Sequence, residues 1–144
     1  MSDNKKYKKV EALLYNYKKS QGEVENLKLK IKEIRQNYDC IRAISYEEKG
    51  SPTNAFNSSV ENEIIKKEKE INAEVFKLNC KEIQLEKIDN AINTLIAREK
   101  TIVYMKYFQK RTSRDIAAKL DLTEVHVCRL KKRIINELTP LILN

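Results

Sequence analysis

Residues 112–134 read TSRDIAAKLDLTEVHVCRLKKRI, an order of residues that is typical of two short helices joined by a tight turn. Thr112 can cap the first helix, and Asp115 completes an approximate capping box with it. Asp121 falls at the turn, where the backbone is often left-handed and where Asp is tolerated better than most residues. The pattern therefore predicts a helix-turn-helix.

Suitable residues also fill the interior of this helix pair. Ile116 and Leu120 are one helical turn apart, and Ala117 is small enough for the second helix to cross closely. The remaining expected core and cap positions are Leu122, Thr123, Val127 and Leu130. Because apolar and small residues coincide with the positions that must be buried, the assignment rests on several independent features.

The outward side of the second helix suggests a DNA-reading surface. In a docked helix-turn-helix, the start of the second helix meets base edges, and later basic residues meet phosphates. Arg129 could bind guanine O6 and N7, and Glu124 could accept a hydrogen bond from cytosine N4. The residues expected at bases are Glu124, Val125, His126, Cys128 and Arg129. The residues expected at phosphates are Arg111, Thr112, Arg114, Thr123, Lys131, Lys132 and Arg133. Each of them, taken singly, also fits an ordinary solvated surface.

Two long upstream segments carry apolar residues seven positions apart, which is typical of helices that pack along a seam. The first segment has the registers Val10, Tyr17, Val24, Ile31, Tyr38 and Leu13, Leu27, Ile34, Ile41. The second has Ile64, Ile71, Leu78, Leu85 and Ile92, supported by Val60, Val75, Ile88 and Leu95. Within the first segment, Ser20, Gly22 and Glu23 indicate a kink or a restart of the helix.

Residues 43–58 interrupt the seven-residue pattern. They contain Gly50 and Pro52, which predicts a loop, and Ser58 or Ser59 can cap the next helix. We therefore expect an all-α chain with a long antiparallel helical hairpin over residues 1–90 and a helix-turn-helix domain over residues 91–144.

A two-helix hairpin has a thin core, so we expect residues 1–90 to form a homodimer. A single hairpin with a solvated outer face is the alternative. The heptads distinguish neither parallel from antiparallel pairing of copies nor a dimer from a higher oligomer.

Composition and charge support this reading. The chain has 144 residues with two Gly, two Pro and 35% charged residues, which favours long helices over a many-stranded sheet. The net charge of +8 is uneven, because residues 91–144 hold 11 lysines and arginines against 5 acidic residues. A basic segment that coincides with a DNA-reading pattern indicates double-stranded DNA as the partner, although the same charge would also favour solubility.

Several other classes of function find no support in the residues. Three cysteines far apart (Cys40, Cys80 and Cys128) and one histidine suit neither a disulfide framework nor a zinc site. No phosphate-binding glycine loop or catalytic group of residues occurs, so we expect no enzyme, no cofactor and no metal. MSDNKKYKK lacks an apolar signal core, and no apolar run is long enough to span a membrane, which indicates an intracellular protein.

Residues 91–139 contain a longer pattern around the helix-turn-helix. Its members are Leu95, Arg98, Glu99, Lys106, Tyr107, Phe108, Thr112, Ile116, Ala117, Leu120, Leu122, Thr123, Val127, Arg129 and Leu130. This pattern resembles region four of bacterial RNA polymerase sigma factors, with the general-stress and sporulation types nearest in character. The resemblance implies a recognition helix that reads a promoter element and an apolar side that docks on the polymerase flap. Asp121 replaces the usual turn glycine, and Glu124 stands where a basic residue is frequent, which implies a different DNA target.

The first ninety residues carry heptads instead of the promoter-melting region of that family, so we do not expect a complete sigma factor. The architecture resembles small phage-encoded regulators, such as late-gene activators, with a helical N-terminal part and a region-four-like end. This implies a phage- or prophage-encoded transcription regulator, cytoplasmic in a bacterial cell, that works with RNA polymerase through its flap or a sigma region. Two alternatives are a DNA-organising protein (a small terminase subunit or a segregation factor) and a coiled-coil adaptor of RNA polymerase.

Overall fold

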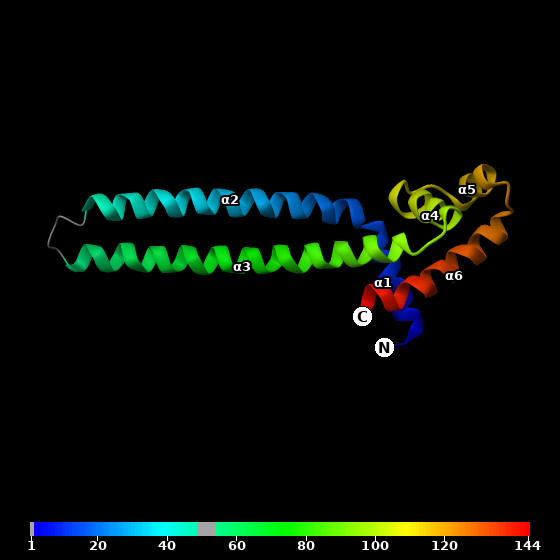
Figure 1. Cartoon of the computed structure of the whole chain (residues 1–144), viewed down its shortest axis with the longest axis horizontal. Coiled ribbons are helices and arrows are strands. Elements are labelled where there is room, and N and C mark those ends of the chain that lie inside the picture. The colour runs from blue at the N-terminus through cyan, green and yellow to red at the C-terminus, as the bar shows by residue number, and fades with distance from the viewer. Residues whose placement is uncertain (1, 49–53) are drawn as a thin grey trace. The chain divides into compact units, whose positions relative to one another are not determined.

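The computed structural model describes residues 2–48 and 54–144, and all of its elements are helices (Figure 1). They are α1 (Asp3–Tyr15), α2 (Tyr17–Glu48), α3 (Asn54–Asn93), α4 (Ala97–Val103), the π-helix η1 (Tyr104–Phe108), α5 (Ser113–Leu120) and α6 (Glu124–Leu143). No strand occurs among these described residues, and the expected all-α class is confirmed. The chain divides into a hairpin unit, Gly22–Glu82, and a composite unit made of Met1–Gln21 and Ile83–Asn144.

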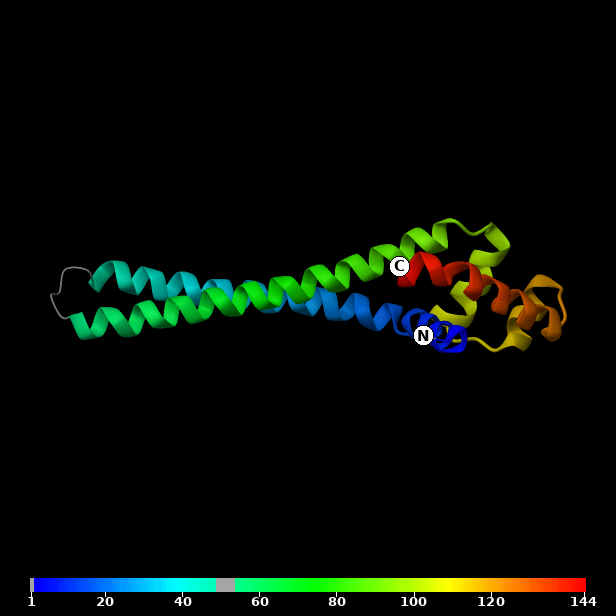
Figure 2. The ribbon, with the colours of Figure 1, turned by 90° about the horizontal axis from the view of Figure 1, so that it is seen from below.

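In the hairpin unit, α2 and α3 lie side by side and run in opposite directions (Figures 1 and 2). The heptad residues Val24, Ile31 and Ile34 of α2 are buried, because they face α3. Polar contacts fix the antiparallel order: Lys30 Nζ lies 3.1 Å from Glu74, and the Tyr38 hydroxyl donates to Glu68 at 2.6 Å. The expected seam is therefore used within one chain.

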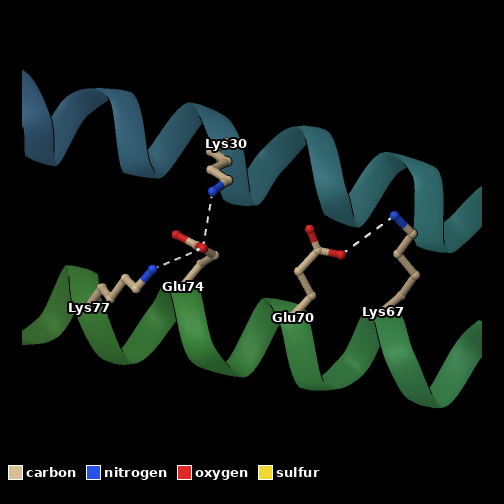
Figure 3. Close-up of polar contacts among 5 residues, drawn as sticks. All are labelled: Lys30, Lys67, Glu70, Glu74 and Lys77. Carbon is tan, nitrogen blue, oxygen red and sulfur yellow. Dashed lines mark hydrogen bonds and ion pairs between the residues drawn. The ribbon is translucent and has the colours of Figure 1, made fainter.

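In the middle of α3, the second register of the seam is polar, which the seven-residue pattern did not predict. Positions 67, 74 and 81 are Lys, Glu and Lys, each seven residues apart. Glu74 is only 6% exposed, and its Oε1 lies 3.1 Å from Lys30 Nζ and 3.5 Å from Lys77 Nζ (Figure 3). The hydrogen bond from Lys30, with the positive charges of both lysines, lowers the pKa of Glu74, so the carboxylate stays ionised in the seam.

The helices extend further toward the connection than the sequence predicts. α2 continues to Glu48 and α3 begins at Asn54, so residues 43–48 and 54–58 of the expected loop are helical. Neither stretch contains Gly or Pro, which explains why the helices are not interrupted there. Ser58 and Ser59 lie inside α3 and therefore do not start it. Gly50 and Pro52 lie outside the described residues.

The first helical segment is interrupted at Asn16, not at Ser20–Glu23. The backbone N–H and the side-chain amide of Asn16 both donate to the Ala12 carbonyl, at 3.0 and 2.9 Å. These two hydrogen bonds satisfy the Ala12 carbonyl in the last turn of α1, and Asn16 is the C-cap of this helix. Gly22 lies within α2, where a Cβ atom would meet nothing within 4 Å. Asp3–Tyr15 thus form a separate helix rather than the start of the hairpin.

The core of the composite unit brings α1 together with the C-terminal helices. Val10 and Leu14, one helical turn apart, are fully buried against α6 and η1. They join Ile116, Val127 and other apolar residues in one cluster that also includes the end of α3. The division at residue 90 expected from the sequence therefore differs from the observed one, because α1 and the last turns of α3 complete the C-terminal core.

Candidate nucleic-acid interface

The first helix of the helix-turn-helix, α5, begins as its sequence predicts. The Thr112 hydroxyl accepts a hydrogen bond from the Asp115 N–H at 3.2 Å, and Thr112 is the N-cap. The carboxylate of Asp115 lies in the first turn, where it suits the positive end of the helix. Ile116 and Ala117 are buried under the following helix. The predicted cap and the core positions Ile116 and Ala117 are confirmed, whereas Leu120 is only partly buried against the same core.

The turn between the two helices contains Asp121 in the left-handed conformation, with φ 54° and ψ 44°. The Asp121 and Leu122 N–H groups both reach the Ala117 carbonyl, which closes the end of α5. Asp tolerates this conformation, and the short turn sets the crossing of the two helices. The left-handed Asp121 is therefore confirmed.

The second helix, α6, is capped by Thr123, whose hydroxyl accepts from the His126 N–H at 3.1 Å. Val127 and Leu130 are buried, as predicted. The residues expected to read bases are all exposed; they are Glu124, Val125, His126, Cys128 and Arg129. Val125, Cys128, Arg129 and Lys132 follow one another at helical spacing, so they share the face opposite Val127 and Leu130. This face is the candidate DNA-contacting surface, with the residues expected at bases near its start and Lys132 further along.

The residues predicted to meet phosphates fall into two groups. Arg111, Thr112, Arg114, Thr123 and Lys132 are exposed. Lys131 is half-buried, and its Nζ lies 3.8 Å from the Glu11 carboxylate of α1. Arg133 lies 3.6 Å from the buried carboxylate of Glu99 and 3.8 Å from Glu137. Lys131 and Arg133 thus have intramolecular partners that sequence reasoning missed, since Glu11 and Glu99 are remote in the chain.

Aromatic residues of η1 connect the first helices of the chain to the segment that precedes α5. The Tyr107 ring is buried in η1, and its hydroxyl donates to Glu11 Oε2 at 2.8 Å. Burial and the neighbouring Glu11 carboxylate raise the pKa of Tyr107, so this hydroxyl keeps its proton and remains a donor. Phe108 stacks on Tyr17 with ring centroids 4.6 Å apart. These contacts tie residues 1–21 to the start of the helix-turn-helix.

Further features of the described part of the chain concern metal binding, free cysteines and membrane crossing. Among the described residues, no group of three or more His, Cys, Asp or Glu side chains is placed to hold a metal ion. Cys40, Cys80 and Cys128 are exposed free thiols. No described helix is both long and apolar enough to cross a membrane.

Comparison with known proteins gives matches in the C-terminal part of the chain. Residues 91–139 match the family described as Sigma-70, region 4. The RNA polymerase sigma-F factor of Priestia megaterium is 39% identical over 51 residues, which are 35% of this chain and 20% of that protein. The sigma-F factor of Bacillus subtilis strain 168 is 37% identical over the same shares.

The chain spans about a fifth of the length of the curated relatives it matches. No solved structure gives a significant match. The resemblance read from the sequence is confirmed by this match over residues 91–139, and the caps Thr112 and Thr123 form as the sequence predicts. The C-terminal segment 91–139 is therefore a helix-turn-helix domain of the sigma-70 region 4 type.

Proposed function

We propose that this protein is a sequence-specific regulator of transcription that binds double-stranded DNA through α6 and works beside RNA polymerase. The observation that carries the proposal is the exposed face of α6, on which Arg129 lies next to Val125 and Lys132. It belongs to a composite unit with 18 lysines and arginines against 9 acidic residues. An exposed recognition helix in a basic domain fits the major groove of DNA.

RNA polymerase enters the proposal through the relatives. Both are named as RNA polymerase sigma factors, and the similar segment is their region 4 type of domain. The rest of this chain folds as the hairpin unit and α1, so we infer an accessory regulator of the phage activator type. Co-sedimentation with bacterial RNA polymerase, with and without promoter DNA, tests this partner directly.

DNA reading is tested by comparing Arg129→Ala with Lys132→Ala on sites selected from random duplexes. Arg129 lies near the start of α6, where a guanidinium can grip a guanine with two hydrogen bonds worth ~1–3 kcal/mol of discrimination. Lys132 lies almost a turn later, where basic side chains usually meet phosphate. We expect Arg129→Ala to lose affinity mainly on the selected site. Lys132→Ala should weaken selected and random DNA alike and lower the salt slope by about one phosphate contact.

Thermal melts must show that both variants fold, because Arg129 adjoins the buried Leu130. Equal losses for the two variants on every sequence would contradict base reading by α6. If the unaltered protein bound random duplexes as tightly as selected ones, a DNA-organising role would replace sequence-specific regulation.

The homodimer expected from residues 1–90 remains a prediction. The heptad face of α2 packs on α3 within the chain, so it is not available to a second copy. Ile65 and Phe76 of α3 are 49% and 70% exposed, and their spacing of eleven residues puts them on one face. We infer that a second copy covers this face. Phe76→Glu should shift the protein from dimer to monomer in sedimentation, whereas Leu29→Glu on α2 should not. A monomeric unaltered protein would contradict this part of the proposal.

A further inference from the structure

Helix α1 is strongly basic and belongs to the same unit as the recognition helix. α1 holds four lysines against two acidic residues, and residues 1–21 as a whole hold six lysines against the same two. The hairpin unit, in contrast, holds 11 lysines and arginines against 12 acidic residues. The excess positive charge of the chain therefore lies entirely in the composite unit. Lys5, Lys8 and Lys9 of α1 are all exposed.

Buried and polar contacts hold α1 against α6. Val10 and Leu14 are fully buried in the common core. Glu11 accepts a hydrogen bond from the Tyr107 hydroxyl at 2.8 Å and lies 3.8 Å from Lys131 Nζ. Since Lys131 directly precedes Lys132 of the outward face, Glu11 lies beside the flank of the recognition helix.

Tyr7 extends this contact along α6. Its side chain packs on the core, and burial first, then the nearby Glu11 and Cys128 groups, raise its pKa. Cys128 lies on the outward face of α6 with Arg129, and its sulfur is 3.8 Å from the Ser113 hydroxyl at the start of α5. The edge of α1 that contains Tyr7 and Glu11 therefore borders α6, the second helix of the helix-turn-helix.

The exposed lysines continue from this edge. Lys8 precedes Glu11 by three residues, which places the two side chains on neighbouring positions of the helix surface. Lys5 precedes Lys8 by three residues and Lys9 by four, so the three lysines form one ridge. The ridge carries three positive charges. Within α1, the acidic residue three or four positions from a ridge lysine is Glu11, which is engaged by Tyr107 and Lys131.

We propose that α1 is a second DNA-contacting element, in which Lys5, Lys8 and Lys9 bind backbone phosphates beside the groove that receives α6. The inference rests on the proposed DNA binding by α6. Phosphates line both sides of a groove, and long lysine side chains neutralise them without reading sequence. DNA is favoured over an acidic protein surface because the ridge lies on the solvent side of α1, in the same unit as the recognition helix and on a helix whose Glu11 contacts Lys131 of α6.

The test uses the full chain and three matched variants. The first changes the ridge (K5Q, K8Q and K9Q together), and the second keeps its charge (K5R, K8R and K9R). The control variant removes the same charge from exposed lysines of the hairpin unit (K32Q, K66Q and K69Q). Affinity for a selected and a random duplex is measured over a range of salt concentrations, and circular dichroism confirms that each variant is folded.

We expect the slope of log K against log salt to become shallower by ~1.8 or more in the ridge variant. Each lost phosphate contact contributes about 0.9, so this change corresponds to the loss of at least two of the three lysine contacts. The loss should be equal on both duplexes, and the arginine variant and the hairpin control should keep the original slope. Equal slopes for the ridge variant and the control would overturn the inference while the proposed function stands. Unchanged DNA binding with lost RNA polymerase association would assign the ridge to a protein partner instead. If the unaltered protein bound no duplex DNA, the proposed function itself would fail.

Discussion

The most consequential structural prediction concerns Leu14, which fixes α1 to the helix-turn-helix domain. α1 has only 13 residues, and an isolated helix of this length is marginal in water, so its stability depends on packing. Leu14 is fully buried in the core of the composite unit. Leu14→Ala removes three buried carbon atoms, which corresponds to about 2.4 kcal/mol of transfer free energy at ~0.8 kcal/mol each. With the cavity left behind, the free energy of unfolding should fall by ~3–5 kcal/mol.

The matched control is Leu29→Ala, since Leu29 is 62% exposed on α2. That change should alter the free energy of unfolding by no more than ~0.5 kcal/mol. Because the two units can unfold separately, urea denaturation is combined with hydrogen exchange read on peptides of α1 and α6. Leu14→Ala should speed exchange in α1 and in the Leu130–Leu138 part of α6. If Leu14→Ala proved as mild as Leu29→Ala, or left α6 protection unchanged, the docking of α1 on this core would be refuted.

Three further predictions test local features. Asp121→Gly should raise the free energy of unfolding by ~0.5–1 kcal/mol, because Gly adopts the left-handed conformation without strain; a lower melting temperature would contradict this. The Tyr17 hydroxyl donates to Asp89, and burial first, then this bond, raise the pKa of Tyr17 from 10.0 to about 12. The folded state therefore holds this proton more tightly than the unfolded state, and stability should be lost as pH rises from 10 to about 12. Tyr17→Phe should remove that part of the pH dependence, and a denaturation series identical to that of the unaltered protein would be inconsistent with it. Glu74→Lys should lower the melting temperature of the hairpin unit, and adding Lys30→Glu should restore it by re-forming the pair; an additive double variant would exclude direct coupling.

The helix-turn-helix could be predicted because its rules are local. Thr112, Asp121 and Thr123 act through hydrogen bonds or backbone angles within a few residues, and the structure has all three as expected. The buried positions Ile116 and Val127 follow from helical periodicity alone. Heptads likewise predict that α2 packs on α3, since a seam repeats over many turns.

The position of α1 could not be predicted because it depends on contacts between distant residues. Val10 continues the heptad register of α2, so periodicity alone joins α1 to the hairpin. Only the fold shows that Asn16 ends the helix and that Glu11 meets Tyr107 across 96 residues. The charge of residues 1–90 taken together does not reveal the basic α1, because the slightly acidic hairpin unit offsets it.

The polar register of α3 explains why the hairpin pairs in one alignment. An apolar heptad seam tolerates a slip of seven residues, since equivalent side chains then meet again. Here Glu74 is opposite Lys30, and Lys81 is opposite Glu23. A slip by one heptad in one direction would place Glu74 against Glu23. A slip in the other direction would place Lys81 against Lys30 and leave Glu74 with Lys77 of its own helix alone. Since a buried carboxylate that loses its partner on the facing helix is unfavourable, the Glu74 layer favours one register that a fully apolar seam would not specify.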